Sequence, residues 1–147
     1  MCLWIIELIK PAFEISVLPE GMTNLLVESI FLKIAGVSLI SISLVLLAVT
    51  LYHFKTSLRF GTNEKNKGEL ITTGIFSLTR NPFFLSLDLY FLGISMLLPT
   101  LFFIGFSALA LISIHFFILN EEKFMIKVYS EEYEKYAQKV QRYILIC

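Results

Sequence analysis

The chain has few charges, no excess of charge of either sign and almost no cysteine. Of its 147 residues 16% are charged, and 12 Lys or Arg balance 12 Asp or Glu. Cys2 and Cys147 lie at the two termini without metal-ligand spacing, which argues against a disulfide framework and against a metal site. Because the formal charge is zero, we expect no nucleic-acid partner. The sequence also has no internal repeats and no low-complexity segment.

Apolar residues are what the chain has in abundance. They make up 56% of the sequence, 14% of the residues are aromatic, and the mean hydropathy is +0.77. These values lie far above those of ordinary soluble domains and predict an integral membrane protein. A chain of 147 residues has room for one compact bundle. We therefore expect a single all-α membrane domain over residues 1–147, with three to four transmembrane helices.

Three segments are long and apolar enough to cross a bilayer, which takes about 20 residues because the hydrocarbon core is about 30 Å thick. They are residues 30–52, 82–98 and 101–119. The last two are separated only by Pro99-Thr100. A link that short predicts the tip of an antiparallel helical hairpin.

Residues 1–18 are apolar but are interrupted by charged residues and a proline, namely Glu7, Lys10, Pro11 and Glu14. The segment lacks a small-residue cleavage site, so it does not match a cleaved signal peptide. We expect a short or partly inserted first span.

Basic residues gather in the loop over residues 53–81 and in the tail over residues 120–147. By contrast, the only charged residues in the segment over 19–28 are acidic. The positive-inside rule therefore predicts that the loop and the tail face the cytoplasm.

Two helix boundaries can be placed from local signals. Asn81 suits an N-cap, where its side chain can accept hydrogen bonds from free amides, and Pro82 suits the first helical position. Beyond Leu119 the sequence becomes amphipathic, with aromatic and aliphatic residues at three- and four-residue spacing. This pattern predicts a cytosolic helix that lies along the bundle. We expect a break near Tyr129-Ser130, with the Ser130 side chain capping the helix that follows.

Glu121 and Glu122 directly follow the apolar part of the third segment. If the helix ended there, both carboxylates would lie at the negative end of its dipole. Either the helix continues past them or a cation lies nearby, and Lys123 is one candidate.

Asp88 lies inside the segment over 82–98, where a carboxylate facing lipid would be unfavourable. We expect it to face the bundle and to hydrogen-bond with Tyr90, Ser41 or Ser43. Two further positions each have two interpretations. Arg80 either extends toward the headgroups as an anchor or binds an anion, and Gly74 either permits a tight turn or lets the backbone approach a ligand.

Four motifs occur in order along the chain and together resemble one family. They are Glu69-Leu-Ile-Thr-Thr-Gly-Ile-Phe-Ser-Leu-Thr-Arg-Asn-Pro-Phe-Phe84, Asn120-Glu-Glu-Lys-Phe124, Tyr129-Ser-Glu-Glu-Tyr-Glu-Lys-Tyr136 and Val140-Gln-Arg142. The combination resembles the isoprenylcysteine carboxyl methyltransferase family with its phospholipid N-methyltransferase relatives. The resemblance covers about residues 55–143.

The resemblance implies that the protein is a methyltransferase using S-adenosylmethionine, bound on the cytosolic side, with a lipophilic or lipid-linked acceptor arriving from the membrane. No metal is required. The cofactor-binding residues expected from it are Gly74, Phe76, Asn81, Pro82, Phe84, Glu122, Tyr133 and Tyr136. The expected catalytic residues are Arg80, Glu121, Glu122 and Arg142.

The sequence departs from the family pattern at two places. Ser130 stands where the family usually has glycine in the turn of the tail. The arginine that many members carry shortly before the acidic pair is missing, and His115 is the nearest candidate to replace it. The acceptor group is therefore left open among carboxylate, amine and thiol, with Glu121, Glu122 and His115 as candidate bases for the last two.

Two other functions compete with methyl transfer. The chain could be a non-catalytic membrane scaffold that uses its basic loop and tail to hold anionic lipid or a protein partner. It could also be a reductase related to the membrane sterol reductases, although that group usually has many more spans. The oligomeric state is open at this stage.

Overall fold

The computed structural model describes Ile5, residues 18–55 and residues 70–143. The elements, all helical, are α2 (Glu20–Thr23), α3 (Ile30–Lys55), the 3-10 helix η1 (Gly74–Ser77), α4 (Pro82–Leu97), α5 (Leu101–Tyr129) and α6 (Glu131–Lys139). The expected first span over residues 1–18 lies outside the described residues, apart from Ile5 and Leu18.

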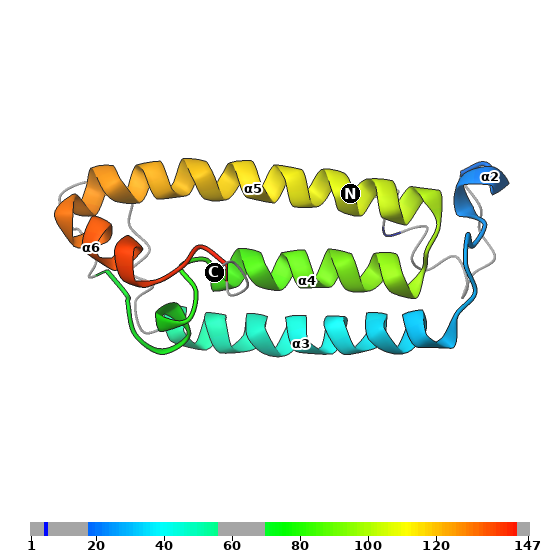
Figure 1. Ribbon diagram of the computed structural model, residues 1–147, viewed down its shortest axis with the longest axis horizontal. Coiled ribbons are helices and arrows are strands. Elements are labelled where there is room, and N and C mark those ends of the chain that lie inside the picture. Colours follow the sequence, from blue (N-terminus) through cyan, green and yellow to red (C-terminus); the bar gives the residue numbers. More distant parts are fainter. Residues whose placement is uncertain (1–4, 6–17, 56–69, 144–147) are drawn as a thin grey trace.

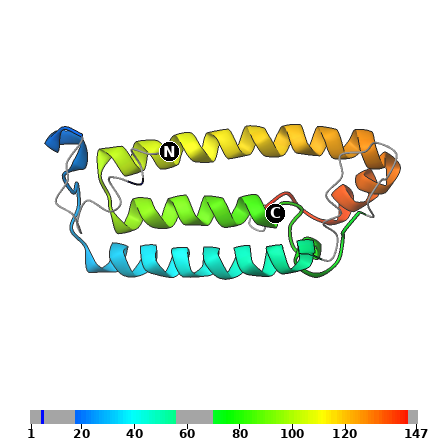
Figure 2. The ribbon, with the colours of Figure 1, turned by 180° about the vertical axis from the view of Figure 1, so that it is seen from behind.

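The three long helices run lengthwise beside one another, with α4 in the middle (Figure 1). It packs against α3 on one side and against α5 on the other. Figure 2 shows from behind that α6, η1 and the C-terminal segment gather at the end where α4 begins. We call this the site end. The opposite end, where the α4–α5 hairpin turns and α2 lies, is called the tip end.

Two described helices are long and apolar enough to cross a membrane, α3 over Ile30–His53 and α5 over Leu101–Tyr129. Both leave large apolar side chains uncovered: Phe31 is 80% exposed and Phe117 67%. A soluble protein would bury such surface, whereas lipid accommodates it. The third helix, α4, is equally apolar but has 16 residues, or a length of about 24 Å. Whether it crosses the whole bilayer stays a prediction.

Small residues bring the backbones of α3 and α4 together. They recur every seven residues on both segments: Gly36, Ser43 and Thr50 in α3, and Gly93, Ser86 and Thr79 in and just before α4. All six are buried. A Cβ added to Gly36 would lie 2.7 Å from the carbonyl oxygen of Gly93, and the Ser43 hydroxyl donates to the carbonyl of Ser86 at 2.8 Å. Close approach at small residues is how membrane helices gain packing energy without a hydrophobic driving force.

The predicted helical hairpin is confirmed. The first helix ends at Leu97 and the second begins at Leu101. Thr100 caps α5, since its hydroxyl accepts a hydrogen bond from the Phe103 amide at 3.2 Å. Further along the hairpin, the Ser107 hydroxyl donates to the carbonyl of Phe91 at 2.9 Å, which ties α5 to α4.

The segment over 101–119 continues as a helix beyond its apolar part, which was one of the two alternatives stated for Glu121 and Glu122. Helix α5 runs from Leu101 to Tyr129, giving a length of about 43 Å. The last ten residues therefore extend past a hydrocarbon core of about 30 Å. The predicted break near Tyr129-Ser130 is confirmed, because α6 starts at Glu131 after Ser130 adopts φ 50°.

The predicted side-chain caps are wrong, although the boundaries hold. Helix α4 begins at Pro82 after Asn81, yet the Asn81 side chain caps no amide of that helix. Its amide group points instead toward α5, where it donates to Glu122. The Ser130 side chain makes no cap hydrogen bond either. At Asn81 the side chain contacts Glu122 instead of capping the helix. At Ser130 the positive φ of the backbone forms the turn.

The serine partners expected for Asp88 are also wrong. Ser41 donates to the carbonyl of Val37 within its own helix, and Ser43 donates to Ser86. The Oδ1 atom of Asp88 is buried and has no hydrogen-bond partner among the described residues. A buried acceptor without a partner is unfavourable.

Candidate active site

One carboxylate at the site end is surrounded by donors from three parts of the chain. Arg142 contacts Glu122 in a bidentate manner, with Nη2 at 2.6 Å from Oε2 and Nε at 3.1 Å from both oxygens. The Nη2 atom of Arg80 lies 3.3 Å from Oε1, and Asn81 donates to the same oxygen at 3.3 Å. Helices α4 and α5 and the C-terminal segment are thus joined through Glu122.

The C-terminal segment reaches this place because it returns along the start of α4 after α6 ends. Val140 is extended, with φ −118° and ψ 132°. The amide of Arg80 then donates to the carbonyl of Gln141 at 2.9 Å, and the Thr79 hydroxyl donates to the carbonyl of Arg142 at 2.8 Å. These two backbone contacts place the Arg142 guanidinium beside the end of α5.

The protonation of Glu122 follows from these contacts. Burial alone would raise the pKa of its carboxyl group. The hydrogen bond from Arg142 and the charges of Arg80 and Arg142 outweigh burial and hold the pKa below its ordinary value. The same hydrogen bond raises the pKa of Arg142. The cluster is therefore an ionised pair with a second arginine beside it, and Glu122 is a poor proton acceptor.

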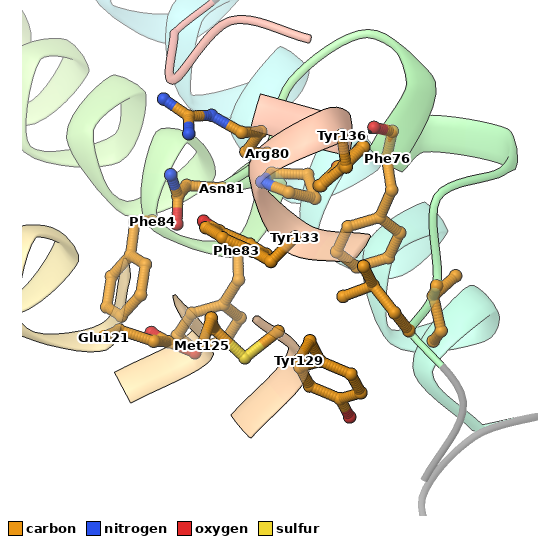
Figure 3. Close-up of a pocket in the computed structure, with 13 residues that line it drawn as sticks. Phe76, Arg80, Asn81, Phe83, Phe84, Glu121, Met125, Tyr129, Tyr133 and Tyr136 are labelled. Atoms are coloured by element: carbon orange, nitrogen blue, oxygen red, sulfur yellow. Dashed lines mark hydrogen bonds between the residues drawn. The ribbon is translucent and has the colours of Figure 1, made fainter. Parts of the chain in front are cut away.

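A cavity of about 260 Å³ lies next to this cluster. It is lined by Leu70, Ile71, Phe76, Arg80, Asn81, Pro82, Phe83, Phe84, Glu121, Met125, Tyr129, Tyr133 and Tyr136. Figure 3 shows Glu121, Met125 and Tyr129 of α5 along one side, with Arg80 and Asn81 on the other. Six of the lining residues are aromatic. Glu121 is the one carboxylate among the described lining residues.

The aromatic wall is held in place by contacts between α6 and η1. The Tyr136 hydroxyl donates to the carbonyl of Phe76 at 2.6 Å, and Tyr133 is buried beside Tyr136 with their ring centroids 5.9 Å apart. Burial raises the pKa of Tyr136 to about 12, so its hydroxyl is a permanent donor near neutral pH. Gly74, which begins η1 at φ 65°, lies against the ring of His53, where a Cβ would clash.

The structure brings most of the predicted site residues together. Of those expected to bind a cofactor, the ones that line the cavity are Phe76, Asn81, Pro82, Phe84, Tyr133 and Tyr136. Of those expected to be catalytic, Arg80 and Glu121 line it. Glu122 and Arg142 are not among its lining residues and form an ion pair with each other. Gly74 does not line the cavity. The ring of His53 occupies the space where a side chain at position 74 would lie.

The candidate residues named from the sequence leave out five lining residues, Leu70, Ile71, Phe83, Met125 and Tyr129. Two of them could have been found. Met125 and Tyr129 follow Glu121 at intervals of four residues, which places all three on one face of a continuous helix. The sequence left open whether the helix continues past Glu121, so the three residues could not be assigned to one helix face. Leu70 and Ile71 precede the recognisable motif and carry no comparable pattern.

A second polar contact joins α5 to the C-terminal segment. The Nδ1 atom of His115 is 3.0 Å from the Tyr143 hydroxyl, and the two rings stack at 6.3 Å with an interplanar angle of 20°. His115 thus contacts the C-terminal segment and does not line the cavity.

Comparison with known families identifies the family to which the chain belongs. The phospholipid methyltransferase family matches residues 31–132, which include almost all of α3, then η1, α4 and α5 with the acidic pair Glu121–Glu122. A search of curated proteins and a search of solved structures found no match. Because the family match covers most of the sequence, the chain belongs to the phospholipid methyltransferase family, which also contains the isoprenylcysteine carboxyl methyltransferases.

Membership carries a class of activity: the family's members are membrane methyltransferases. The predicted family relationship is thereby confirmed.

Proposed function

We propose that the protein transfers a methyl group from S-adenosylmethionine to a lipophilic acceptor, and that the aromatic cavity at the site end holds the cofactor. The observation that supports this most is the composition of the cavity wall. Six aromatic rings, one arginine and one carboxylate meet around a space of about 260 Å³, within a chain of a methyltransferase family.

The residues of the wall fit the chemistry of that cofactor. A sulfonium cation is attracted to aromatic faces by about 0.5–2 kcal/mol for each good contact, and Phe83, Phe84 and Tyr133 offer such faces. Glu121 can accept hydrogen bonds from an amino group or from ribose hydroxyls. The Nε atom of Arg80 is buried and has no hydrogen-bond partner among the described residues. The Arg80 residue also lines the cavity, so its guanidinium adds positive charge that can attract a carboxylate there.

The cofactor, when bound, supplies an electrophilic methyl carbon on a sulfonium centre. The protein then has to align an acceptor with that carbon at about 3–3.5 Å. The rings of Phe83 and Phe84 and the face of α5 around Met125 keep water away from the reacting atoms. The ion pair of Glu122 with Arg142 fixes the C-terminal segment against α4, and thereby holds the Arg80 end of the cavity in shape.

Glu121 and Glu122 have different roles in this proposal. Glu122 uses its oxygens on Arg80, Arg142 and Asn81, so it positions other residues and takes no proton. Glu121 lines the cavity and is available to accept a proton from an amine or thiol acceptor. A general base at the right place contributes about 10²–10⁴-fold to a rate.

The proposed orientation places the site end in the cytoplasm. Cationic residues of the described chain gather there: Arg80, Lys123, Lys127, Lys135, Lys139 and Arg142. The charged residues of the described chain at the tip end include Lys33 and Glu28. This asymmetry satisfies the positive-inside rule, and it would let a water-soluble cofactor and a membrane-dissolved acceptor reach the same cavity from two directions.

The test uses the purified full-length protein in lipid vesicles with methyl-labelled S-adenosylmethionine. We expect saturable binding and transfer of label into the organic phase when membrane lipid extract is present. Glu121→Gln should reduce transfer by at least about a hundredfold and leave the fold intact, whereas Glu132→Gln on the exposed face of α6 should change neither. Absence of saturable binding in the wild-type protein would contradict the proposal and favour the non-catalytic scaffold.

A further inference from the structure

Helix α3 has no residue among those that line the cavity, but one of its side chains lies against the segment that carries the aromatic wall. That side chain is His53, two residues before α3 ends at Lys55. In Figure 1 the short helix η1 lies beside this end of α3, and the two are in contact. The function proposed above gives this contact no role.

The orientation of the His53 ring is fixed within its own helix. Its Nδ1 atom is 2.8 Å from the carbonyl oxygen of Val49, one turn earlier. A carbonyl oxygen only accepts hydrogen bonds, so Nδ1 carries a proton and donates it. The opposite edge of the ring, made of Nε2 and Cδ2, then faces Gly74. The contact with Val49 therefore orients the ring independently of η1.

Gly74 allows η1 to approach that edge closely. A Cβ built on Gly74 would lie 2.5 Å from Cδ2 of His53 and would also overlap Nε2. Gly74 has φ 65° as well, a backbone conformation that residues with a Cβ rarely adopt. Two constraints thus exclude a side chain at position 74, and one of them, the ring, comes from a distant part of the chain.

The position of η1 determines the position of part of the aromatic wall. Gly74 begins η1, and Phe76, two residues later, is buried and lines the cavity. The Phe76 carbonyl accepts the hydrogen bond from the Tyr136 hydroxyl at 2.6 Å, and Figure 3 shows the two residues together at the cavity. The Ser77 hydroxyl donates to the carbonyl of Gly74 at 2.7 Å. A displacement of Gly74 would therefore move Phe76 and disturb its contact with Tyr136.

We propose that His53 is a positioning residue of the cofactor site, because its ring supports Gly74 and thereby sets where Phe76 and Tyr136 meet the ligand. The inference rests on the proposed cofactor cavity. A 3-10 helix of four residues has too few internal hydrogen bonds to keep its place alone, so its position depends on its neighbours. His53 supplies the contact from α3, and Tyr136 supplies the one from α6. The site end of a long apolar helix is thus coupled to the affinity for a cationic cofactor.

The experiment is a double-mutant cycle on the purified full-length protein, with the affinity for S-adenosylmethionine as the readout. His53→Ala removes the support and should weaken binding by about two- to thirtyfold, the range of one lost contact between a cation and an aromatic ring. Gly74→Ala introduces a clash with the ring and should weaken binding at least as much. In the double variant the added methyl group enters the space that the ring has left. Its affinity should therefore exceed the product of the two losses by at least about fivefold.

Two control variants and one local measurement accompany the cycle. Leu51→Ala truncates an exposed side chain of α3, and Gly105→Ala adds a Cβ with nothing within 4 Å; both should bind S-adenosylmethionine like the wild type. Hydrogen–deuterium exchange is measured without cofactor. The amides of Phe76 and Leu78 donate to carbonyls of their own segment and should exchange faster in His53→Ala, while exchange within α5 and the melting temperature stay at their wild-type values.

The cofactor cavity and the role of His53 fail in different ways. If His53→Ala binds S-adenosylmethionine as tightly as Leu51→Ala does, or if the two losses simply multiply in the double variant, His53 is not a positioning residue. If the wild type binds no S-adenosylmethionine, yet exchange in η1 rises in both single variants and falls again in the double variant, His53 supports η1 and the cofactor assignment is wrong.

A second substitution keeps the test available should His53→Ala fail to fold. His53→Ser removes the ring but can keep the hydrogen bond to Val49, since Ser38 and Ser41 each donate to the carbonyl four residues earlier in the same helix. It then replaces His53→Ala in the cycle, with the same expected losses and the same recovery in combination with Gly74→Ala. Wild-type affinity in His53→Ser would overturn the proposal.

Discussion

Replacing Glu122 with glutamine tests whether the ion-pair cluster holds the site end together. The substitution keeps the size of the side chain but removes the charge that pairs with Arg142 and Arg80. Breaking a fully buried pair by removing one partner destabilises a protein by about 3–5 kcal/mol. The Glu122 side chain is 9% exposed, but that of Arg142 is 33% exposed, so water relieves part of the loss. We expect about 2–4 kcal/mol.

That loss should appear as a lower melting temperature. For a chain of this length 1 kcal/mol corresponds to about 2–4 °C, so Glu122→Gln should melt about 4–16 °C below the wild type. The measurement is the fraction of protein that remains monodisperse by size-exclusion chromatography after heating in detergent. The matched control is Glu131→Gln, which removes an exposed pair with Lys135 at 3.6 Å and should leave the melting temperature unchanged.

The pH dependence gives a second reading of the same contact. The pKa of Glu122 is lowered in the folded protein, so its contribution to stability is complete above the ordinary carboxyl pKa and is lost as the pH falls through the lower folded value. The wild type should lose stability more steeply than Glu122→Gln as the pH falls below about 4.5. A Glu122→Gln protein that melts within a degree of the wild type, with the same acid profile, would refute the structural role of Glu122.

Three further predictions concern packing, backbone strain and one tyrosine. Gly36→Ala places a Cβ 2.7 Å from backbone atoms of α4 and should lower stability by about 1–3 kcal/mol in the same melting assay, whereas Gly105→Ala, with nothing within 4 Å of its added Cβ, should be neutral or stabilising. Ser130→Gly should raise stability by about 1 kcal/mol, because Ser130 holds φ 50°, which glycine adopts without strain; an unchanged or lower melting temperature would contradict this. Burial raises the pKa of Tyr136 to about 12, so the stability that Tyr136 contributes is complete below a pH of about 10 and is lost as the pH rises toward 12. Absorbance titration should show a late-ionising tyrosine that disappears in Tyr136→Phe. A titration curve without that step would contradict the assignment.

Local signals predicted those parts of the fold that depend on neighbouring residues. Pro99-Thr100 placed the hairpin tip, Pro82 placed the start of α4, and the change in pattern near Ser130 placed the break before α6. Each of these signals acts through backbone geometry within one turn. The end of α5 at Tyr129 matches the predicted break, whereas the drop in hydropathy after Leu119 marks where apolar character ends and carries no information about where helical hydrogen bonding ends.

Most residues of the candidate site could be predicted from the sequence, but the different roles of Glu121 and Glu122 could not. The spacing of the motifs indicated that Arg80, Asn81 and the acidic pair come together. Which glutamate faces the cavity depends on the path of the C-terminal segment, because Arg142 selects Glu122 only after that segment returns along α4. Such a return is a tertiary contact between residues far apart in sequence, and no local pattern specifies it.

The small residues at which α3 and α4 pack together also determine the position of α4 along the axis of α3. Shifting α4 by two turns would put Ser86 opposite Gly36, where the facing backbones leave no space for an additional atom. One alignment is therefore permitted. Gly93 lies about 18 Å along the helix from Asn81, so a bulky substitution near the tip end would displace Arg80 and Asn81 along the helix axis without touching either of them.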